Sequence, residues 1–158
     1  MPRMKAFRGF VPNPDRVEPG AVICPPYDVI PDEMHGQLLN HAPENAVRWI
    51  LGDEPGVTPD EDVFRKCGES MRSAVEAGTI IHEEKPAIYR YSIRYGNRAG
   101  GTSLLQGVIA VAEARPWGEG VERHEEIRPH TVARLVNQAR LTTIDTGVVQ
   151  LSCEGLEE

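Results

Sequence analysis

The stretch that decides the fold runs from Thr58 to Gly78 and reads TPDEDVFRKCGESMRSAVEAG. It opens with a capping-box pattern in which proline takes the first helical position and acidic residues fill the first turn, where the helix dipole favours them. Apolar residues then recur with the period of about 3.6 typical of one helix face, at Val63, Phe64, Cys67, Met71, Ala74 and Val75. Because Gly78 is a typical helix stop, the pattern predicts a core helix that begins at Pro59 and ends before this glycine.

Helix and strand signals on both sides of this stretch predict an α+β domain. Proline and early acidic residues predict a helix over Pro31–Asn40, and a further helix is expected over Thr131–Leu141. The predicted strands are Ala46–Leu51, Ala87–Arg94 and Ser103–Ala112, with a hairpin across Tyr95–Gly101 that joins the last two. We therefore expect a mixed β-sheet with helices packed on one side. One domain would span residues 1–158 and end in a short acidic tail at 154–158.

The composition is that of a globular protein. The chain has 158 residues, of which 40% are hydrophobic and 26% are charged, so wholesale disorder is excluded. Its longest apolar run, Val108–Ala112, is far shorter than a transmembrane helix, and no signal-peptide core follows the N-terminus. The net charge of -7 disfavours nucleic acid as a partner. The three cysteines are widely spaced and odd in number, which favours a reducing compartment, so the sequence predicts a cytoplasmic protein. Neither a membrane nor a nucleic acid is expected as its partner. The segment Gly52–Pro59 resembles an exposed connector.

Two segments carry residues that the scaffold does not need, and the first is Cys24–Ile30, with the sequence CPPYDVI. Its two prolines stiffen a loop that precedes the helix at Pro31, so Tyr27 and Asp28 are held in position. Asp28 is a candidate general base or metal-bound carboxylate, and Tyr27 is a candidate substrate-binding residue. The alternative is structural, because an aspartate near a helix start often belongs to a turn and caps the helix.

The second segment, Gly120–Thr131, gathers acids, an imidazole and arginines just before a proline-led helix. Because a helix N-terminus attracts anions, we expect a phosphate there, with Arg128 and Arg134 bound to its oxygens. His124 would supply a proton or a hydrogen bond, and Glu125 would hold a metal or orient the imidazole. The other phosphate- or substrate-binding candidates of this region are Arg123 and Thr131. The alternative is a solvated cluster of ion pairs in which the acids and arginines neutralise one another.

Five short motifs, taken in order, resemble those of a known prokaryotic family. They are Ala6–Gly9, Pro25–Ile30, Pro43–Arg48, Pro86–Tyr91 and Gly120–Glu125. With them the chain resembles domain-of-unknown-function family number 1015 from its N-terminus to about Leu151. The resemblance implies, as features that the family shares, Tyr27, Asp28, His124, Glu125 and Arg134. Family members usually have a threonine where this chain has Ile127, and they usually continue well past the point where this chain ends.

The resemblance also implies a fold and a choice of activities. The domain is similar to the ParB and sulfiredoxin-like fold, a group that includes nucleotide-binding switches and free-serine kinases in which a carboxylate activates the hydroxyl. This implies a small-molecule phosphotransferase that uses ATP or ADP with Mg²⁺ to phosphorylate a free hydroxyl compound such as serine. The alternatives are a nucleotide or phosphoester hydrolase, and a phosphate- or nucleotide-binding module without catalysis. The expected partners are a nucleotide and a small-molecule substrate, and the sequence leaves open whether the chain forms a homo-oligomer.

Overall fold

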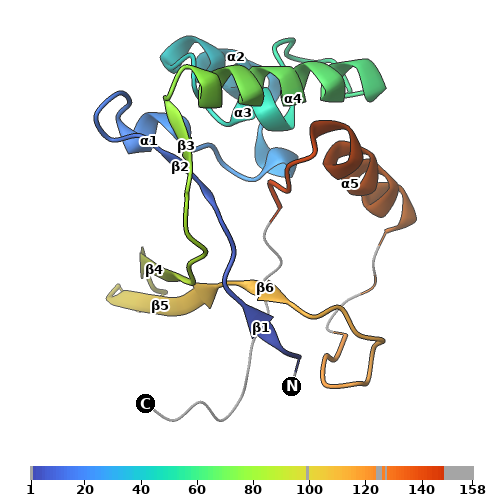
Figure 1. Cartoon of the computed structure of the whole chain (residues 1–158). Helices are drawn as coiled ribbons and strands as arrows, with labels where there is room; N and C mark the ends of the chain where they lie inside the picture. The colour runs from blue at the N-terminus through green and yellow to red at the C-terminus, as the bar shows by residue number, and fades with distance from the viewer. Residues whose placement is uncertain (1, 99, 124–125, 127, 148–158) are drawn as a thin grey trace.

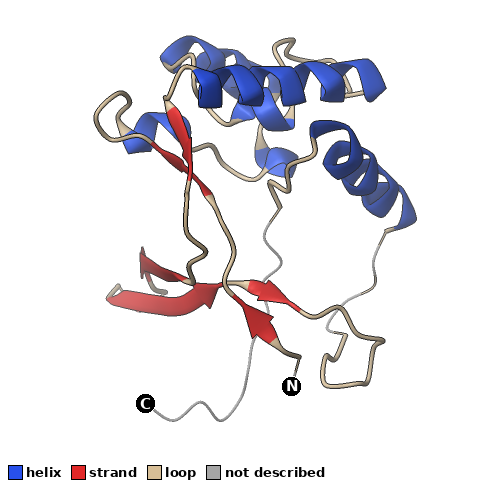
Figure 2. Ribbon diagram, viewed as in Figure 1, coloured by secondary structure: helices blue, strands red, loops and turns tan. Residues whose placement is uncertain are grey.

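The computed structural model describes residues 2–98, 100–123, 126 and 128–147, and these form an α+β fold (Figures 1 and 2). The helices are α1 (Pro19–Val22), the 3-10 turn η1 (Tyr27–Val29), α2 (Asp32–His41), α3 (Val47–Ile50), α4 (Glu61–Glu76) and α5 (Pro129–Thr142). The strands are β1 (Met4–Lys5), β2 (Phe10–Pro12), β3 (Ile80–His82), β4 (Tyr89–Gly96), β5 (Thr102–Ile109) and β6 (Val111–Ala112). The predicted fold class is therefore confirmed.

The helices gather at one end of the molecule and enclose its core. In Figure 1, α2, α3 and α4 lie together above the strands, and α5 packs against α4. The core cluster is formed by Val22, Trp49, Met71 and Ile80. At Gly68 a Cβ atom would lie 3.0 Å from the Cα atom of Thr142, so a larger residue would press on the backbone of α5 where the two helices approach each other. None of the helices that the structure describes is long and apolar enough to cross a membrane.

The helix α4 begins two residues later than the capping pattern predicts. Its N-cap is Asp60, whose Oδ1 atom accepts a hydrogen bond of 2.9 Å from the backbone N–H of Val63. Pro59 therefore precedes the helix instead of opening it, because the Asp60 carboxylate provides the cap that Thr58 was expected to provide. The end agrees with the prediction: Gly78 adopts a φ of +72°, a conformation that glycine reaches without strain.

The strand expected at Ala46–Leu51 is wrong, because this segment forms the short helix α3. Asn45 is 1% exposed, and its side-chain amide donates hydrogen bonds of 2.8 Å and 3.0 Å to the backbone carbonyls of Ala21 and Ile23. Its Oδ1 atom accepts from the N–H of Val47, which turns the chain into a helical conformation. The apolar side chains that suggested a strand enter the core from this short helix.

Within the described ranges the strands form three separate two-stranded sheets, β1–β6, β2–β3 and β4–β5. Every pair among the residues that the structure describes is antiparallel, so the expected mixed sheet is wrong. The predicted hairpin is confirmed: Tyr89 lies opposite Ile109 and Gly96 opposite Thr102. It projects away from the helices in Figure 1.

The N-terminal segment is tied to β4 through a tyrosine. The hydroxyl of Tyr89 accepts a hydrogen bond of 2.8 Å from the N–H of Gly9 and donates one to the carboxylate of Glu83. Its ring lies 5.0 Å from the ring of Phe7, measured between centroids. Phe7 also pairs with Ala87 as an isolated β-bridge. This contact joins the first residues of the chain to the start of the projecting hairpin.

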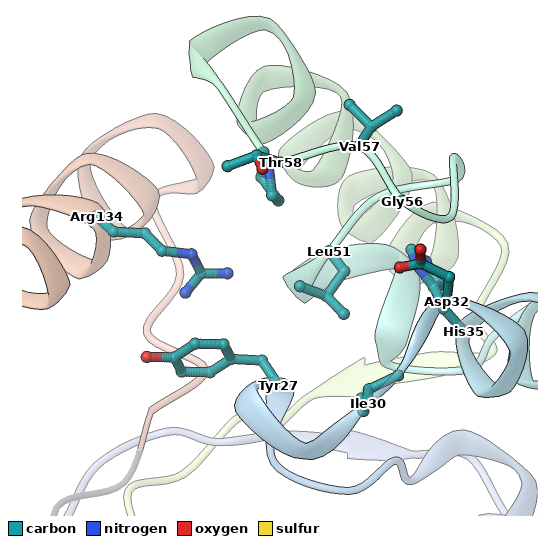
Figure 3. A pocket seen from close by; sticks show the side chains of 10 residues that line it. Tyr27, Ile30, Asp32, His35, Leu51, Gly56, Val57, Thr58 and Arg134 are labelled. Atoms are coloured by element: carbon teal, nitrogen blue, oxygen red, sulfur yellow. The ribbon is translucent and has the colours of Figure 1, made fainter.

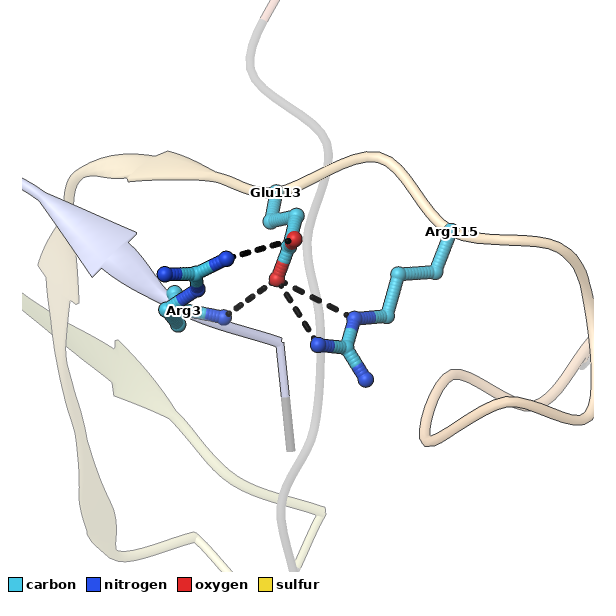
Figure 4. A network of polar contacts seen from close by, with 3 residues as sticks. All are labelled: Arg3, Glu113 and Arg115. Carbon is cyan, nitrogen blue, oxygen red and sulfur yellow. Dashed lines mark hydrogen bonds and ion pairs between the residues drawn. The ribbon is translucent and has the colours of Figure 1, made fainter.

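A second polar contact joins β1 to the segment after β6 (Figure 4). The carboxylate of Glu113 accepts hydrogen bonds of 3.1 Å and 2.9 Å from Nε and Nη2 of Arg115. It also accepts a bond of 3.3 Å from the backbone N–H of Arg3, whose side chain lies 3.5 Å from the other oxygen. These donors, Arg115 first among them, lower the pKa of Glu113. One carboxylate thus connects two segments that are far apart in the sequence.

Candidate functional site

A pocket with a volume of about 250 Å³ opens between α5, η1, the start of α2 and the loop that precedes α4. We call it the arginine pocket; its lining residues are Tyr27, Ile30, Asp32, His35, Leu51, Gly56, Val57, Thr58, Pro59 and Arg134 (Figure 3). The walls combine polar and charged side chains with apolar ones, among them Ile30, Leu51 and Val57. A concave surface that brings charged and apolar groups together is a candidate site for a small molecule.

Arg134 extends from α5 into this pocket and is held there by two aromatic rings. Its guanidinium carbon lies 4.1 Å from the ring centroid of Tyr27 and 5.6 Å from that of Phe64. Its Nη2 atom donates a hydrogen bond of 3.4 Å to the carbonyl of Ile50. Because the rings attract the cation and limit its rotamers, the guanidinium is oriented before any ligand arrives.

The other terminal nitrogen of this guanidinium has no partner in the described part of the chain. Nη1 of Arg134 is buried and has no hydrogen-bond acceptor among the residues that the structure describes. A buried donor without an acceptor costs about 1–3 kcal/mol, and more when the group is charged, so such groups are rare in folded proteins. Nη1 is thus a buried donor without an acceptor in the described part of the chain, as is Nε of Arg48.

Two residues from the start of α2 form the opposite side of the pocket. Asp32 is exposed, and its carboxylate makes no hydrogen bond or ion pair with the described residues. His35 is 4% exposed, and its Nε2 atom lies 2.9 Å from the carbonyl oxygen of Gly52. Because a carbonyl can only accept, Nε2 carries the hydrogen in this contact. The bond fixes the loop after Gly52 against α2 and thereby shapes the pocket.

Of the first predicted segment, Tyr27 lines the pocket and Asp28 does not. Asp28 follows Tyr27 directly in η1 and is exposed. The structural alternative was that it caps a helix, but neither η1 nor α2 has a side-chain cap hydrogen bond. Its carboxylate has no polar partner in the described part of the chain. Asp28 therefore neighbours a lining residue in the sequence without lining the pocket itself.

Of the second predicted segment and the arginine that follows it, Arg134 is the one described residue that lines the arginine pocket. Arg123 lies 3.6 Å from the carboxylate of Glu126 and 5.4 Å from the ring centroid of Trp117, which agrees with the ion-pair alternative for this arginine. Arg128 is the N-cap of α5, and its carbonyl accepts a hydrogen bond from the N–H of Thr131. His124 and Glu125 lie outside the described residues. Arg134 points toward Tyr27, and the gathering of both arginines around a phosphate stays a prediction.

The described cysteines are poor nucleophiles. Burial, with a smaller contribution from the charge of Asp53, raises the pKa of Cys67 to about 11. Burial also raises the pKa of Cys24. A thiol reacts as its thiolate, so neither residue is activated for catalysis at neutral pH. Among the described residues, which do not include Glu125, no three acidic, histidine or cysteine side chains are grouped as metal ligands.

The sequence did not indicate the half of the pocket formed by the start of α2 and the loop before α4. The loop residues of this half are Leu51, Gly56, Val57, Thr58 and Pro59. Most of them belong to Gly52–Pro59, a segment whose sequence resembles an exposed connector. The available signal was the glycines: Gly52 and Gly56 have φ values of +87° and +78°, which make this loop a specific, bent structure.

Comparison with known proteins gives a family but no activity. No curated protein and no solved structure matches the chain. A family model described as "Protein of unknown function (DUF1015)" matches residues 4–157, which is nearly the whole chain. The match confirms the resemblance that the sequence motifs indicated, and this chain belongs to that family.

Proposed function

We propose that this protein binds a small phosphorylated molecule in the arginine pocket, with Arg134 as the ligand of the phosphoryl group. The observation that supports this most is the buried Nη1 atom of Arg134, which has no acceptor among the described residues. A guanidinium held by two rings presents its donors in a fixed plane, which suits the oxygens of a phosphoryl group. The apolar walls at Ile30, Leu51 and Val57 would contact the rest of the molecule.

The proposal is tested by titration with propyl phosphate, followed by calorimetry, on the full chain. We expect Arg134→Gln to weaken binding roughly 10- to 100-fold, because a hydrogen bond to a charged group is lost. Arg140→Gln is the matched control: it makes the same change on the same helix, at an exposed residue that pairs with Glu61 at 3.4 Å. It should leave the affinity unchanged. Equal affinities for the parent and Arg134→Gln, or no binding by the parent, would overturn the proposal.

A second candidate function is phosphoryl transfer from ATP or ADP, with Mg²⁺, to a free hydroxyl compound such as serine. It is favoured by Asp28, which follows Tyr27 directly in η1 and whose carboxylate has no partner among the described residues. In this role Asp28 is the general base, and His124 and Glu125 assist the proton transfer and hold the metal. A hydrolase would use water as the acceptor instead. A kinase of this kind would act in the cytoplasm, where its nucleotide is found.

The kinase proposal predicts that binding and turnover separate in Asp28→Asn. Turnover should fall by roughly 10²–10⁴, the usual contribution of a positioned general base, while nucleotide affinity and the thermal midpoint stay nearly constant. Asp62→Asn, at an exposed site on α4, is the control. ADP formation that depends on serine supports the kinase, and formation without serine supports the hydrolase. Binding of ATP without turnover would support a nucleotide-binding module without catalysis. An unchanged rate in Asp28→Asn would exclude the general-base role.

A further inference from the structure

We infer that the molecule bound in the arginine pocket is a zwitterion that carries an ammonium group at the end opposite its phosphoryl group, with Asp32 as the ligand of the ammonium. The inference rests on the proposed function, since it assumes that Arg134 binds the anionic end. It assigns a second binding residue, Asp32, to the same site and names the class of molecule that the site binds.

The two charged side chains face one another across the pocket. Figure 3 shows Arg134 entering from α5 and Asp32 from the start of α2, with their charged ends directed toward the space between them and Leu51 in the middle. They do not neutralise each other, because the contacts of the described residues include no ion pair between them. A ligand that reaches both sides would meet a cation at one end and an anion at the other.

The carboxylate of Asp32 is available for such a ligand. It has no hydrogen-bond or ion-pair partner in the described part of the chain, although it lies at a pocket wall. Gly56 packs against this carboxylate. A Cβ atom at Gly56, whose φ is +78°, would lie 3.1 Å from Oδ2 of Asp32. A glycine at this bend therefore leaves room for the carboxylate to remain at the wall.

Asp32 would weaken the binding of a ligand that carries only negative charge. Among the described lining residues it is the one acidic side chain, and its charge repels a phosphoryl group that enters without a compensating cation. An ammonium group converts this repulsion into attraction, so the same residue favours one ligand class and disfavours the other. Apolar side chains at Leu51 and Ile30 line the space between the charges, which suits a short hydrocarbon link.

Phosphoethanolamine and propyl phosphate are matched probes, because they have nearly the same shape and differ by the ammonium group. We expect the parent to bind phosphoethanolamine roughly 10- to 100-fold more tightly, as for a charged hydrogen-bonded pair. Asp32→Asn should abolish this preference without weakening the affinity for propyl phosphate. Glu33→Gln changes the next acid in the first turn of α2 and should keep the preference, because Glu33 does not line the pocket.

Arg134→Gln gives the complementary result. It should weaken both probes by the same factor, so the ratio of the two affinities remains that of the parent. Asp32→Ser is a second variant, used if Asp32→Asn fails to give the circular dichroism of the parent. Equal binding of both probes by the parent, or a preference that survives at Asp32→Asn or Asp32→Ser, overturns this inference and leaves the proposed function standing. Binding of neither probe overturns both.

Discussion

The shared carboxylate of Glu113 shows how a single residue responds to its neighbours. Its pKa lies below the usual value of 4.5 because Arg115, and to a smaller extent Arg3, stabilise the charged form. A lowered pKa in the folded state means that the folded chain binds this proton less readily than the unfolded chain. The contribution to stability is therefore fully present above pH 4.5 and is lost as the pH falls through the lowered pKa.

We predict that Arg115→Gln raises the pKa of Glu113 toward its usual value. The measurement is a pH titration of the Glu113 carboxyl carbon by NMR in the parent and the variant. Arg90→Gln, at an exposed arginine of the hairpin, should leave this pKa where it is. A Glu113 titration curve that does not move in Arg115→Gln would show that the arginine does not cause the shift.

At the scale of residues, local sequence signals were enough to identify two of the residues that line the pocket, Tyr27 and Arg134. Two prolines indicated that Tyr27 is held in position, and the basic segment pointed to Arg134. That these two meet depends on the packing of α5 against α4, which brings the guanidinium between the rings of Tyr27 and Phe64. The role of Asp32 could not be predicted, because an acid in a first helical turn is explained by the helix dipole alone.

The start of α4 allows a test at the scale of one element. Asp60→Ala should destabilise the chain by about 1 kcal/mol, because the carboxylate that accepts from the N–H of Val63 is removed. Thr58→Ala removes the residue that the sequence pattern favoured as the cap, and it should cost less than about 0.5 kcal/mol. The free energies of unfolding would be measured in urea. A larger loss at Thr58 than at Asp60 would contradict the observed cap.

The elements differ in how far local sequence determines them. α2, α4, α5 and the β4–β5 hairpin follow signals that lie within each element, such as early acids, a helical period or a glycine-containing turn. The segment at Val47–Ile50 is too short for a period to be recognised, and its helical form depends on Asn45, whose bonds reach residues more than 20 positions away. Tertiary contacts therefore decide this element.

At the scale of the whole molecule, the contact between Gly9 and Tyr89 connects the N-terminus to the hairpin. A Cβ atom at Gly9 would lie 2.6 Å from the Tyr89 hydroxyl, so Gly9→Ala must displace a group that is also bonded to Glu83. We predict a loss of about 1–3 kcal/mol in the free energy of unfolding, as for other overpacked sites.

Gly107→Ala is the control for this prediction. A Cβ atom at Gly107, in β5, would have nothing within 4 Å, so the substitution should change the free energy of unfolding by less than about 0.5 kcal/mol. Unfolding in urea gives both values. If the two glycines prove equally tolerant of alanine, the tyrosine contact does not hold the N-terminal segment.

The isolated β4–β5 hairpin has a consequence for how its backbone exchanges hydrogen with water. Among the residues that the structure describes, each of these strands is paired on one side only, and in an antiparallel pair every second residue directs its N–H outward. The amides that face the other strand are protected, while those between them are open to solvent. Deuterium uptake along 89–96 and 102–109 would therefore alternate between slow and fast residues, a period of two that records the register of the hairpin.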